Sequence, residues 1–442
     1  MRSSRPLFLV ISLFVLGLLV GCGGGGGGGG GGGETTSNSS GGSSSSCSAP
    51  PAIALPNGSS LAPMAGNNVM TLTVNGSECS PATTDSAGYV NKPCVSVTLC
   101  DASGNNCQAI NDILLDTGDY GFRIFQDVLS SLNPSLLAAL NLSAINGSDG
   151  NPIYECIEYG DGATVWGPVV SADVKLGNEQ ASQVPIHLVG SSANSPSTYC
   201  AGAPLLSSHS AANYNGALGL GFRVQDCGSV CESGPTREYY TCTGGTCTES
   251  AVPLAKQVQN LVANLPTDNN GVIVELPSVP SIGALSAAGY VILGIGTEAN
   301  NIPSGVTPYG GNANATFATT FAGVPYEGFL DTGSNGIFVS YSGQPSASGG
   351  WYIPSCTLSL SATNTGAANA PNVGVVDFDI ANADTLAGSG NYVFFNLGGP
   401  MPLGGFFDWG LPFFLGRNVY IGIDGETSEF NSVPVTGPFW AY

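Results

Sequence analysis

Two copies of the tripeptide Asp-Thr-Gly, one in each half of the chain, constrain the fold more than any other feature of this 442-residue sequence. The first copy begins at Asp116 and the second at Asp331, and two apolar residues precede each aspartate. Asp, Thr and Gly are ordinary turn residues, so a single copy would indicate no more than a β-turn. Two copies in matching contexts indicate an internal duplication, in which a hydrophobic strand leads into each turn.

The chemistry of such a pair follows from the distance between its carboxyl groups. If the two turns meet, the carboxyls of Asp116 and Asp331 share a partly desolvated site, and like charges that close cannot both ionise easily. The pair then shares one proton. One carboxylate can deprotonate a water molecule while the other carboxyl gives its proton to a carbonyl oxygen, which hydrolyses an amide without a covalent intermediate.

Short runs of alternating apolar residues between turn signals predict a mostly-β protein. Such runs occur at 70–76, 95–100, 169–177, 184–190, 271–277, 290–296 and 418–424. Helical spacing is rare. It is found at 123–142 and again at 253–265, where a proline stands at a plausible first helical position.

Three further segments accompany the paired turns. In 157–162, the dipeptide Asp161-Gly162 is a strong hairpin signal, which places Tyr159 near the tip of a mobile β-hairpin able to close over a cleft. In 215–222 and 412–418, two apolar residues precede a glycine, Gly219 and Gly416 respectively. A strand with such a glycine can pass close to another backbone where a side chain would clash.

From about residue 69 to the end of the chain, these motifs resemble those of the pepsin-like aspartic proteases, in the same order. The resemblance implies a mostly-β, two-lobed pepsin-like acid protease fold with a central cleft and a few short helices. It implies lobes at 65–266 and 267–442, peptide or protein substrates, no cofactor and no metal, and we expect a monomer. The residues that it assigns are the catalytic Asp116 and Asp331, the active-site turn residues Thr117, Gly118, Asp119, Thr332, Gly333 and Ser334, and the flap residues Tyr159 and Gly160.

One position departs from the family pattern. Asp119 stands where the family has Ser or Thr, whose hydroxyl can hydrogen-bond the catalytic carboxylate. A third carboxylate there would raise the proton affinity of the pair or bind a cation. Asp119 therefore decides between a working protease and a catalytically inactive member of the fold.

The N-terminus predicts export. Arg2 and Arg5 precede an apolar run that is too short to span a bilayer, which indicates a signal peptide at 1–21. The end of this run resembles a bacterial lipobox with Cys22 as the lipidated residue, which implies an anchor to the outer membrane or cell surface. Without lipidation of Cys22 the protein would be secreted. A Gly/Ser-rich tether at 22–64 follows.

Cysteine content and charge agree with this location. Apart from Cys22 there are twelve cysteines, which in an exported protein predict up to six disulfides, with Cys242 and Cys247 bridging their own hairpin. The spacing does not indicate a metal site. A formal charge of −21 argues against nucleic acid as a partner.

Alternatives remain open at this level. The two histidines, His187 and His209, lie outside any motif of serine or zinc hydrolases. A catalytically inactive pepsin-fold protein that binds or inhibits at the cell surface is the second hypothesis, and a disulfide-stiffened envelope component without a cleft ligand is the third. The segments 227–247 and 371–408 resemble insertions.

Overall fold

The computed structural model describes residues 59–79, 89–101, 106–131, 135, 138, 140, 142–190, 194–202 and 204–442. The predicted signal peptide, Cys22 and nearly all of the predicted tether lie outside these residues. Within them, no helix is long and apolar enough to cross a membrane.

The protein is mostly β, as the sequence predicts. The strands of the first half are β1 (Ser59–Ser60), β2 (Val69–Val74), β3 (Pro93–Cys100), β4 (Cys107–Asp116), β5 (Tyr120–Phe125), β6 (Ser143–Ala144), β7 (Ile153–Glu158), β8 (Thr164–Leu176), β9 (Glu179–Val189), β10 (Gly216–Leu220), β11 (Tyr239–Thr243) and β12 (Thr246–Glu249). Those of the second half are β13 (Gly271–Glu275), β14 (Ala287–Leu293), β15 (Pro308–Gly310), β16 (Phe317–Phe321), β17 (Val324–Asp331), β18 (Ile337–Val339), β19 (Ala347–Ser348), β20 (Trp351–Tyr352), β21 (Leu358–Thr365), β22 (Ala367–Pro371), β23 (Val373–Ile380), β24 (Gly398–Gly399), β25 (Phe406–Gly410), β26 (Asn418–Gly422), β27 (Thr427–Phe430), β28 (Val433–Thr436) and β29 (Phe439–Ala441).

Helices are short. The α-helices are α1 (Gln126–Ser131), α3 (His209–Ala212), α4 (Ser229–Ser233), α5 (Ala383–Ala387) and α6 (Leu411–Phe414), and the 3-10 helices are η1 (Cys200–Gly202), η2 (Leu254–Lys256) and η3 (Val262–Asn264). All seven predicted strands are present.

The two helical predictions are wrong in part. The first segment begins as β5, because Arg123 lies between β10 and β9 and pairs with both, and the helix starts only at Gln126. The segment 253–265 forms two 3-10 turns instead of one helix. Between them the Gln257 side chain donates to the carbonyls of Gly228 and Val252, and these tertiary contacts hold the backbone out of a helix.

The two halves repeat one arrangement of strands. In the first half, β10 runs parallel to β4 and antiparallel to β5, and β5 pairs in parallel with β9. In the second half, β25 runs parallel to β17 and antiparallel to β18, and β18 pairs in parallel with β24. The hairpins β3–β4 and β16–β17 precede the two turns in the same way. The duplication inferred from the tripeptides is therefore present in the topology.

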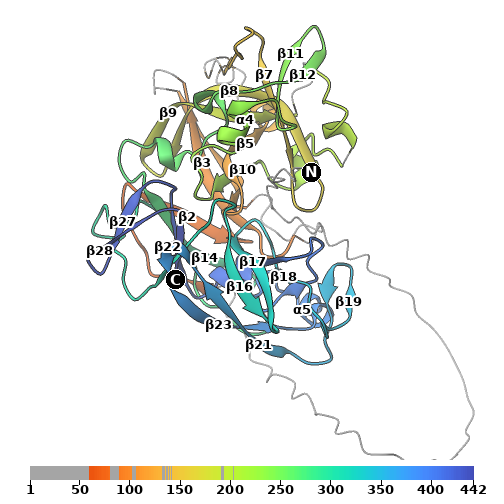
Figure 1. Ribbon diagram of the computed structural model, residues 1–442, viewed down its shortest axis with the longest axis vertical. Coiled ribbons are helices and arrows are strands. Elements are labelled where there is room, and N and C mark those ends of the chain that lie inside the picture. The colour runs from red at the N-terminus through yellow and green to blue at the C-terminus, as the bar shows by residue number, and fades with distance from the viewer. Residues whose placement is uncertain are drawn as a thin grey trace, which may run out of the picture.

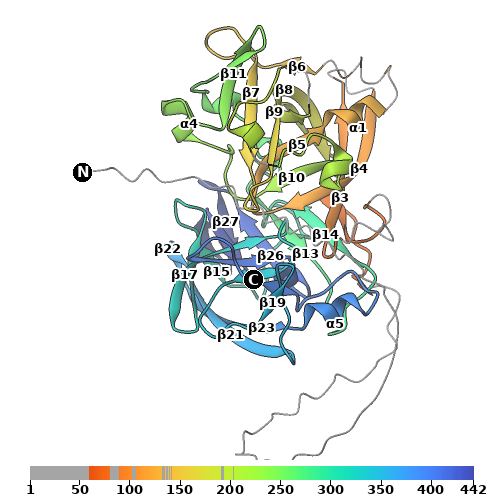
Figure 2. The same cartoon turned by 90° about the vertical axis from the view of Figure 1, so that its right-hand side faces the viewer.

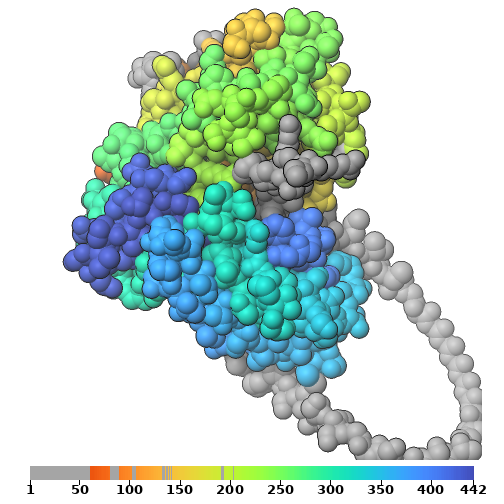
Figure 3. Space-filling view, viewed as in Figure 1, coloured from red at the N-terminus to blue at the C-terminus, as the bar shows by residue number. Residues whose placement is uncertain are grey.

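Strands from both ends of the chain connect the halves. β14 pairs with β2 and β13, and β13 pairs with β26, which pairs with β29. Strands such as β7, β8 and β11 lie in the upper part of the molecule, and β17, β21 and β23 lie in the lower part (Figures 1 and 2). On the face shown in Figure 3, the two parts are in contact along a wide boundary.

The segment 371–408, which resembles an insertion, is built into the second half. It supplies β23 and β24, the two ends of a seven-stranded sheet, and begins β25. The aromatic run 406–414 fills the core, with Phe407, Trp409 and Phe413 packed ring against ring.

Five disulfides are formed by the described cysteines, which indicates an extracytoplasmic protein. The predicted Cys242–Cys247 bridge closes the hairpin β11–β12. Cys356 has no partner among the described cysteines, and Cys47 lies outside the described residues. A sixth disulfide stays a prediction.

Candidate active site

A buried strand leads into each Asp-Thr-Gly turn. Beside it lies a second strand, which carries a glycine opposite the aspartate. Asp116 ends β4 and lies opposite Gly219 of β10, while Asp331 ends β17 and lies opposite Gly410 of β25. A Cβ on Gly219 would lie 2.6 Å from the Tyr120 nitrogen. The first predicted glycine strand is thus confirmed, including the close backbone approach that requires glycine.

The second predicted glycine strand was placed in the wrong segment. The glycine opposite Asp331 is Gly410, whereas Gly416 follows the short helix α6. A Cβ on Gly410 would lie 2.1 Å from the Gly336 carbonyl oxygen. Pro412 in the first turn of α6 suits a helix start, which is why the Phe414-Leu415-Gly416 sequence cannot continue as a strand.

The two turns are joined through their threonines. The backbone N–H of Thr117 donates to Oγ1 of Thr332, and the backbone N–H of Thr332 donates to Oγ1 of Thr117, both at 3.0 Å. The Thr117 hydroxyl donates to the Leu330 carbonyl at 3.0 Å, and the Thr332 hydroxyl donates to the Leu115 carbonyl at 2.7 Å. All four bonds are buried, so the turns form one unit.

This unit places the two aspartate carboxyls together. Oδ1 of Asp116 accepts from the backbone N–H groups of Gly118 and Asp119, at 3.0 and 2.9 Å. Oδ1 of Asp331 accepts from the N–H of Gly333 at 2.7 Å, and Oδ2 accepts from the Ser334 hydroxyl at 2.9 Å. A Cβ on Gly118 would lie 2.5 Å from Cγ of Asp331, so only glycine leaves room for that carboxyl.

The electrostatics are those of a desolvated pair. Burial, followed by the charge of Asp408, raises the pKa of Asp331 to about 8, while hydrogen bonds from Ser334, the Asp116 side chain and Gly333 lower that pKa. Both aspartates are fully buried. The side-chain hydrogen bond between Asp116 and Asp331 means that the two carboxyls can share one proton.

The predicted hairpin is present as β7 and β8, which pair up to Glu158 and Thr164. The N–H of Tyr159 donates to the Ala163 carbonyl at 2.8 Å, and Gly160 stands in the turn. The Tyr159 ring is buried, and burial together with Tyr214 and the acidic groups raises its pKa well above the usual value. Tyr159 also hydrogen-bonds Tyr214. The side chain thus lies inside the molecule, toward the aspartates.

Asp119 does not direct its carboxyl at Asp116. Its Oδ2 accepts from Nη1 of Arg123 at 2.7 Å, and its Oδ1 accepts from the N–H of Tyr120 at 2.7 Å. The sequence allowed Asp119 to bind a cation, and that cation is the chain's own guanidinium. Only the backbone N–H of Asp119 contacts the Asp116 carboxyl.

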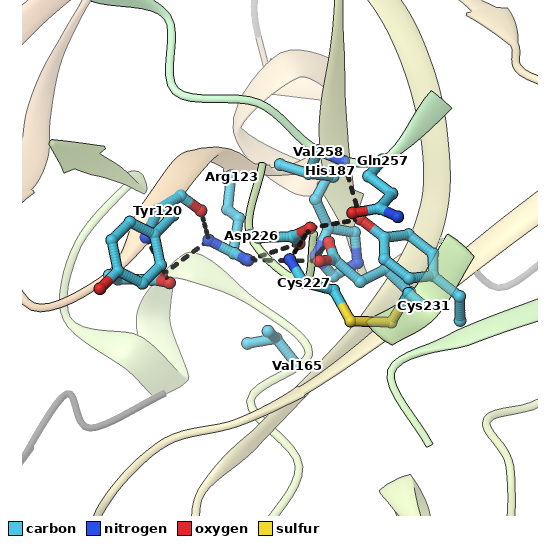
Figure 4. Close-up of polar contacts among 12 residues, drawn as sticks. Tyr120, Arg123, Val165, His187, Asp226, Cys227, Cys231, Gln257 and Val258 are labelled. Atoms are coloured by element: carbon cyan, nitrogen blue, oxygen red, sulfur yellow. Dashed lines mark hydrogen bonds and ion pairs between the residues drawn. A yellow bond between two sulfur atoms is a disulfide. The ribbon is translucent and has the colours of Figure 1, made fainter. Parts of the chain in front are cut away.

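Arg123 is the centre of a buried charge cluster (Figure 4). Its Nη2 lies 3.2 Å from Glu155 of β7 and 3.4 Å from Asp226, and Nδ1 of His187 lies 2.8 Å from Glu155. The cluster therefore ties the turn after Asp116 to the hairpin β7–β8. The sequence signal that could have indicated it is a lone arginine inside the apolar run of β5.

In this cluster one guanidinium faces three carboxyls. Burial raises the pKa of Asp119 to about 7, although the charge of Arg123 acts in the opposite direction. Burial and then Glu155 raise the pKa of Asp226 well above its usual value. Burial and then Arg123 lower the pKa of His187 well below its usual value, so this imidazole is neutral. His187 is structural, as its position in a strand indicates.

Sequence reasoning also missed Asp408. It lies in β25, is fully buried, and its Oδ2 is 2.5 Å from the Ser334 hydroxyl. Its signal is a single carboxylate within an otherwise apolar aromatic run.

Among the residues that the structure describes, no group of potential metal ligands is free to bind an ion. Two groups bring three potential ligands together, but their cysteines, Cys79 with Cys94 and Cys227 with Cys231, are joined in disulfides.

Comparisons with known proteins give a family and, among solved structures, weak structural likeness. No curated protein matches the chain. Among solved structures, the aspartic proteinase from Irpex lacteus is similar at 13% identity with a TM-score of 0.41, over 84% of this chain and 96% of that one. Residues 64–442 match the family described as "Protein of unknown function (DUF3443)". The chain therefore belongs to the DUF3443 family.

Proposed function

We propose that this protein is an aspartic endopeptidase with the two-lobed pepsin-like fold, hydrolysing peptide bonds with Asp116 and Asp331. The observation that carries the proposal is the reciprocal hydrogen bonding of Thr117 and Thr332, which joins the two Asp-Thr-Gly turns. A generic turn has no need of a partner turn from the other half of the chain. The repeated strand topology around each aspartate supports the same reading.

In the proposed reaction, the carboxyl pair holds one proton and a water molecule. The ionised member removes a proton from the water, which attacks the peptide carbonyl carbon, and the protonated member gives its proton to the carbonyl oxygen. The tetrahedral intermediate then collapses: the carboxyl that took the proton from water gives it to the departing amine, and the other carboxylate takes back a hydroxyl proton as the carbonyl reforms, so that the pair again holds one proton. The backbone N–H groups of Gly118 and Gly333 keep the carboxyls oriented throughout.

Asp119 is compatible with this reaction. Its carboxyl contacts Arg123 and not the Asp116 carboxyl, and Asp116 receives two backbone N–H groups in place of the missing hydroxyl. The flap residues Tyr159 and Gly160 belong to the hairpin that Arg123 contacts through Glu155, so the turn and the flap are positioned together.

The remaining parts of the proposal concern location and partners. We propose that the protein acts outside the cytoplasm, held at the bacterial outer membrane or cell surface by lipid on Cys22. Its substrates are peptides or unfolded proteins, and it works as a monomer without a cofactor. The five disulfides support an oxidising compartment.

The test is cleavage of a chemically unfolded protein by the purified full-length chain, from about pH 2 to pH 7. We expect acid-favoured cleavage that Asp331→Asn abolishes and that a hydroxyl-bearing transition-state mimic inhibits. Asp384→Asn, which changes an exposed carboxyl, is the matched control and should cleave normally. Full activity in Asp331→Asn, or no cleavage at any pH, would contradict the proposal.

A second candidate is a catalytically inactive surface protein that binds or inhibits through the same region. Complete burial of both aspartates favours it, because neither carboxyl is accessible to water in this state. Peptide binding that persists in Asp116→Ala, without cleavage in the unmodified chain, would support this candidate over the protease.

A further inference from the structure

Asp408 is a buried carboxyl placed next to the catalytic pair. It lies in β25, opposite Phe329 of β17 and Phe338 of β18, so apolar residues flank it on both neighbouring strands. Its side chain reaches the turn after Asp331, where it contacts Ser334. The charged groups that face it are Asp331 and Asp116.

The Ser334 hydroxyl lies between two carboxyls. Its Oγ is 2.9 Å from Oδ2 of Asp331 and 2.5 Å from Oδ2 of Asp408. A serine hydroxyl has one hydrogen and can donate it to only one of them. The other contact needs a hydrogen from the carboxyl itself, so one of the two aspartates must donate to Ser334.

The geometry identifies Asp408 as that donor. Among the residues that the structure describes, Oδ1 of Asp408 has no hydrogen-bond partner, although it is fully buried. An ionised carboxylate with one oxygen unpaired in such a place would be very costly. Asp331, in contrast, accepts a hydrogen bond on each oxygen, from Gly333 and Ser334, which suits the ionised form.

We propose that Asp408 is a protonated positioning residue, which donates to Ser334 and thereby directs the Ser334 hydroxyl hydrogen onto Asp331. This inference deepens the proposed function and rests on it. The chain of hydrogen bonds makes Asp331 the acceptor, and hence the base toward water, and it assigns the shared proton to Asp116. Ser334 thus receives its orientation from a residue that no substrate touches.

The electrostatics agree with this chain. Burial raises the pKa of Asp408 well above its usual value, with Asp116 acting in the same direction and Ser334 opposing. The charge of Asp408 is the second cause of the raised pKa of Asp331. A proton on Asp408 removes that cause, which leaves Asp331 free to ionise at a lower pH.

The first experiment reads protonation without needing activity. The infrared carbonyl band of neutral carboxylic acids is recorded for the full-length chain at neutral pH, where exposed carboxyls are ionised. We expect Asp408→Asn to lose part of this band, whereas Asp384→Asn, at an exposed position, keeps all of it. An unchanged band in Asp408→Asn would overturn the inference, whether or not the protein cleaves peptides.

The second experiment is the pH profile of cleavage. The amide of Asp408→Asn is neutral and can still donate to Ser334, so we expect the acid limb to move by less than about 0.3 pH unit. If Asp408 were ionised, removing its charge would lower the pKa of the pair and shift this limb about one unit toward acid, which would contradict the inference. Asp408→Leu cannot donate a hydrogen bond to Ser334. We therefore expect it to lower kcat by a larger factor than the factor by which it changes KM.

Failure of the two proposals can be told apart. A chain that never cleaves, but loses the infrared band in Asp408→Asn, contradicts the protease while it supports the hydrogen-bond chain. A chain that cleaves in an Asp331-dependent way, but keeps the band in Asp408→Asn, supports the protease and overturns the role of Asp408.

Discussion

Thr117 and Thr332 each donate a backbone N–H to the hydroxyl oxygen of the other, and both bonds measure 3.0 Å. The two residues come from opposite halves of the chain, at the ends of β4 and β17. The two hydroxyls repeat this symmetry, because Thr117 donates to the Leu330 carbonyl and Thr332 donates to the Leu115 carbonyl. The consequence is that the Asp116 and Asp331 carboxyls are brought together by backbone and threonine contacts, independently of any substrate.

Thr117→Val keeps the shape of the side chain and removes the hydroxyl. It leaves the Thr332 N–H and the Leu330 carbonyl without their buried partner, so we expect a loss of about 1–3 kcal/mol in the free energy of unfolding. Urea denaturation measures it. Thr117→Ser, which keeps the hydroxyl, should lose much less, and equal losses in both variants would show that the hydroxyl contacts do not hold the turns.

Arg123→Met removes the cation from a cluster of three buried carboxyls. We expect a loss of roughly 3–5 kcal/mol in the free energy of unfolding at neutral pH, because Asp119 and Glu155 are left buried without their partner. The comparison is Arg237→Met, at an exposed arginine stacked over Tyr199, which should change stability by about 0.5 kcal/mol or less. Similar small effects of both substitutions would contradict a structural role for the cluster.

Stability should fall as the pH rises from about 4 to about 7. The pKa of Asp119 rises from 3.8 to about 7 on folding, because burial disfavours its charge. Between these values the unfolded chain has released this proton and the folded chain still holds it, so raising the pH favours unfolding. The stability that the Asp119 proton contributes is fully present below the pKa of this group in the unfolded chain. It is lost once the pH exceeds the pKa of Asp119 in the folded chain.

Urea denaturation at a series of pH values checks this sign. Asp119→Asn cannot titrate, so its decline in stability across the same range should be shallower than that of the unmodified chain. Burial also raises the pKa of Asp226 well above its usual value, so some decline should persist in the variant. An equal slope in Asp119→Asn and in the unmodified chain would show that Asp119 does not hold a proton in this range.

Gly410→Ala tests the corrected second glycine strand. The added Cβ would lie 2.1 Å from the Gly336 carbonyl oxygen, so β25 must shift beside Asp331. We expect a loss of about 1–3 kcal/mol in unfolding free energy, and a larger relative loss of cleavage. Gly404→Ala, where a Cβ meets nothing within 4 Å, is the matched control. If both variants behave alike, the glycine at 410 is not required by its surroundings.

Much of the fold follows from local sequence, and so do the two Asp-Thr-Gly turns of the candidate site. Several features depend on residues that are near one another in the chain, and each is present. They are the paired tripeptides, the alternating strands, the hairpin that turns at Gly162 and the Cys242–Cys247 bridge. The second glycine strand was misplaced, because two segments with a similar apolar-to-glycine pattern follow one another and only pairing with β17 distinguishes them.

The sequence by itself determined that two aspartates end matching strands and stand in matching turns, because turn chemistry and strand periodicity are local properties. Only the tertiary structure decided what surrounds them. Asp119 is paired with Arg123, and Asp408 reaches Ser334 from 74 residues away. The protonation of buried carboxyls depends on which groups from distant strands exclude water from them, and no local pattern records that.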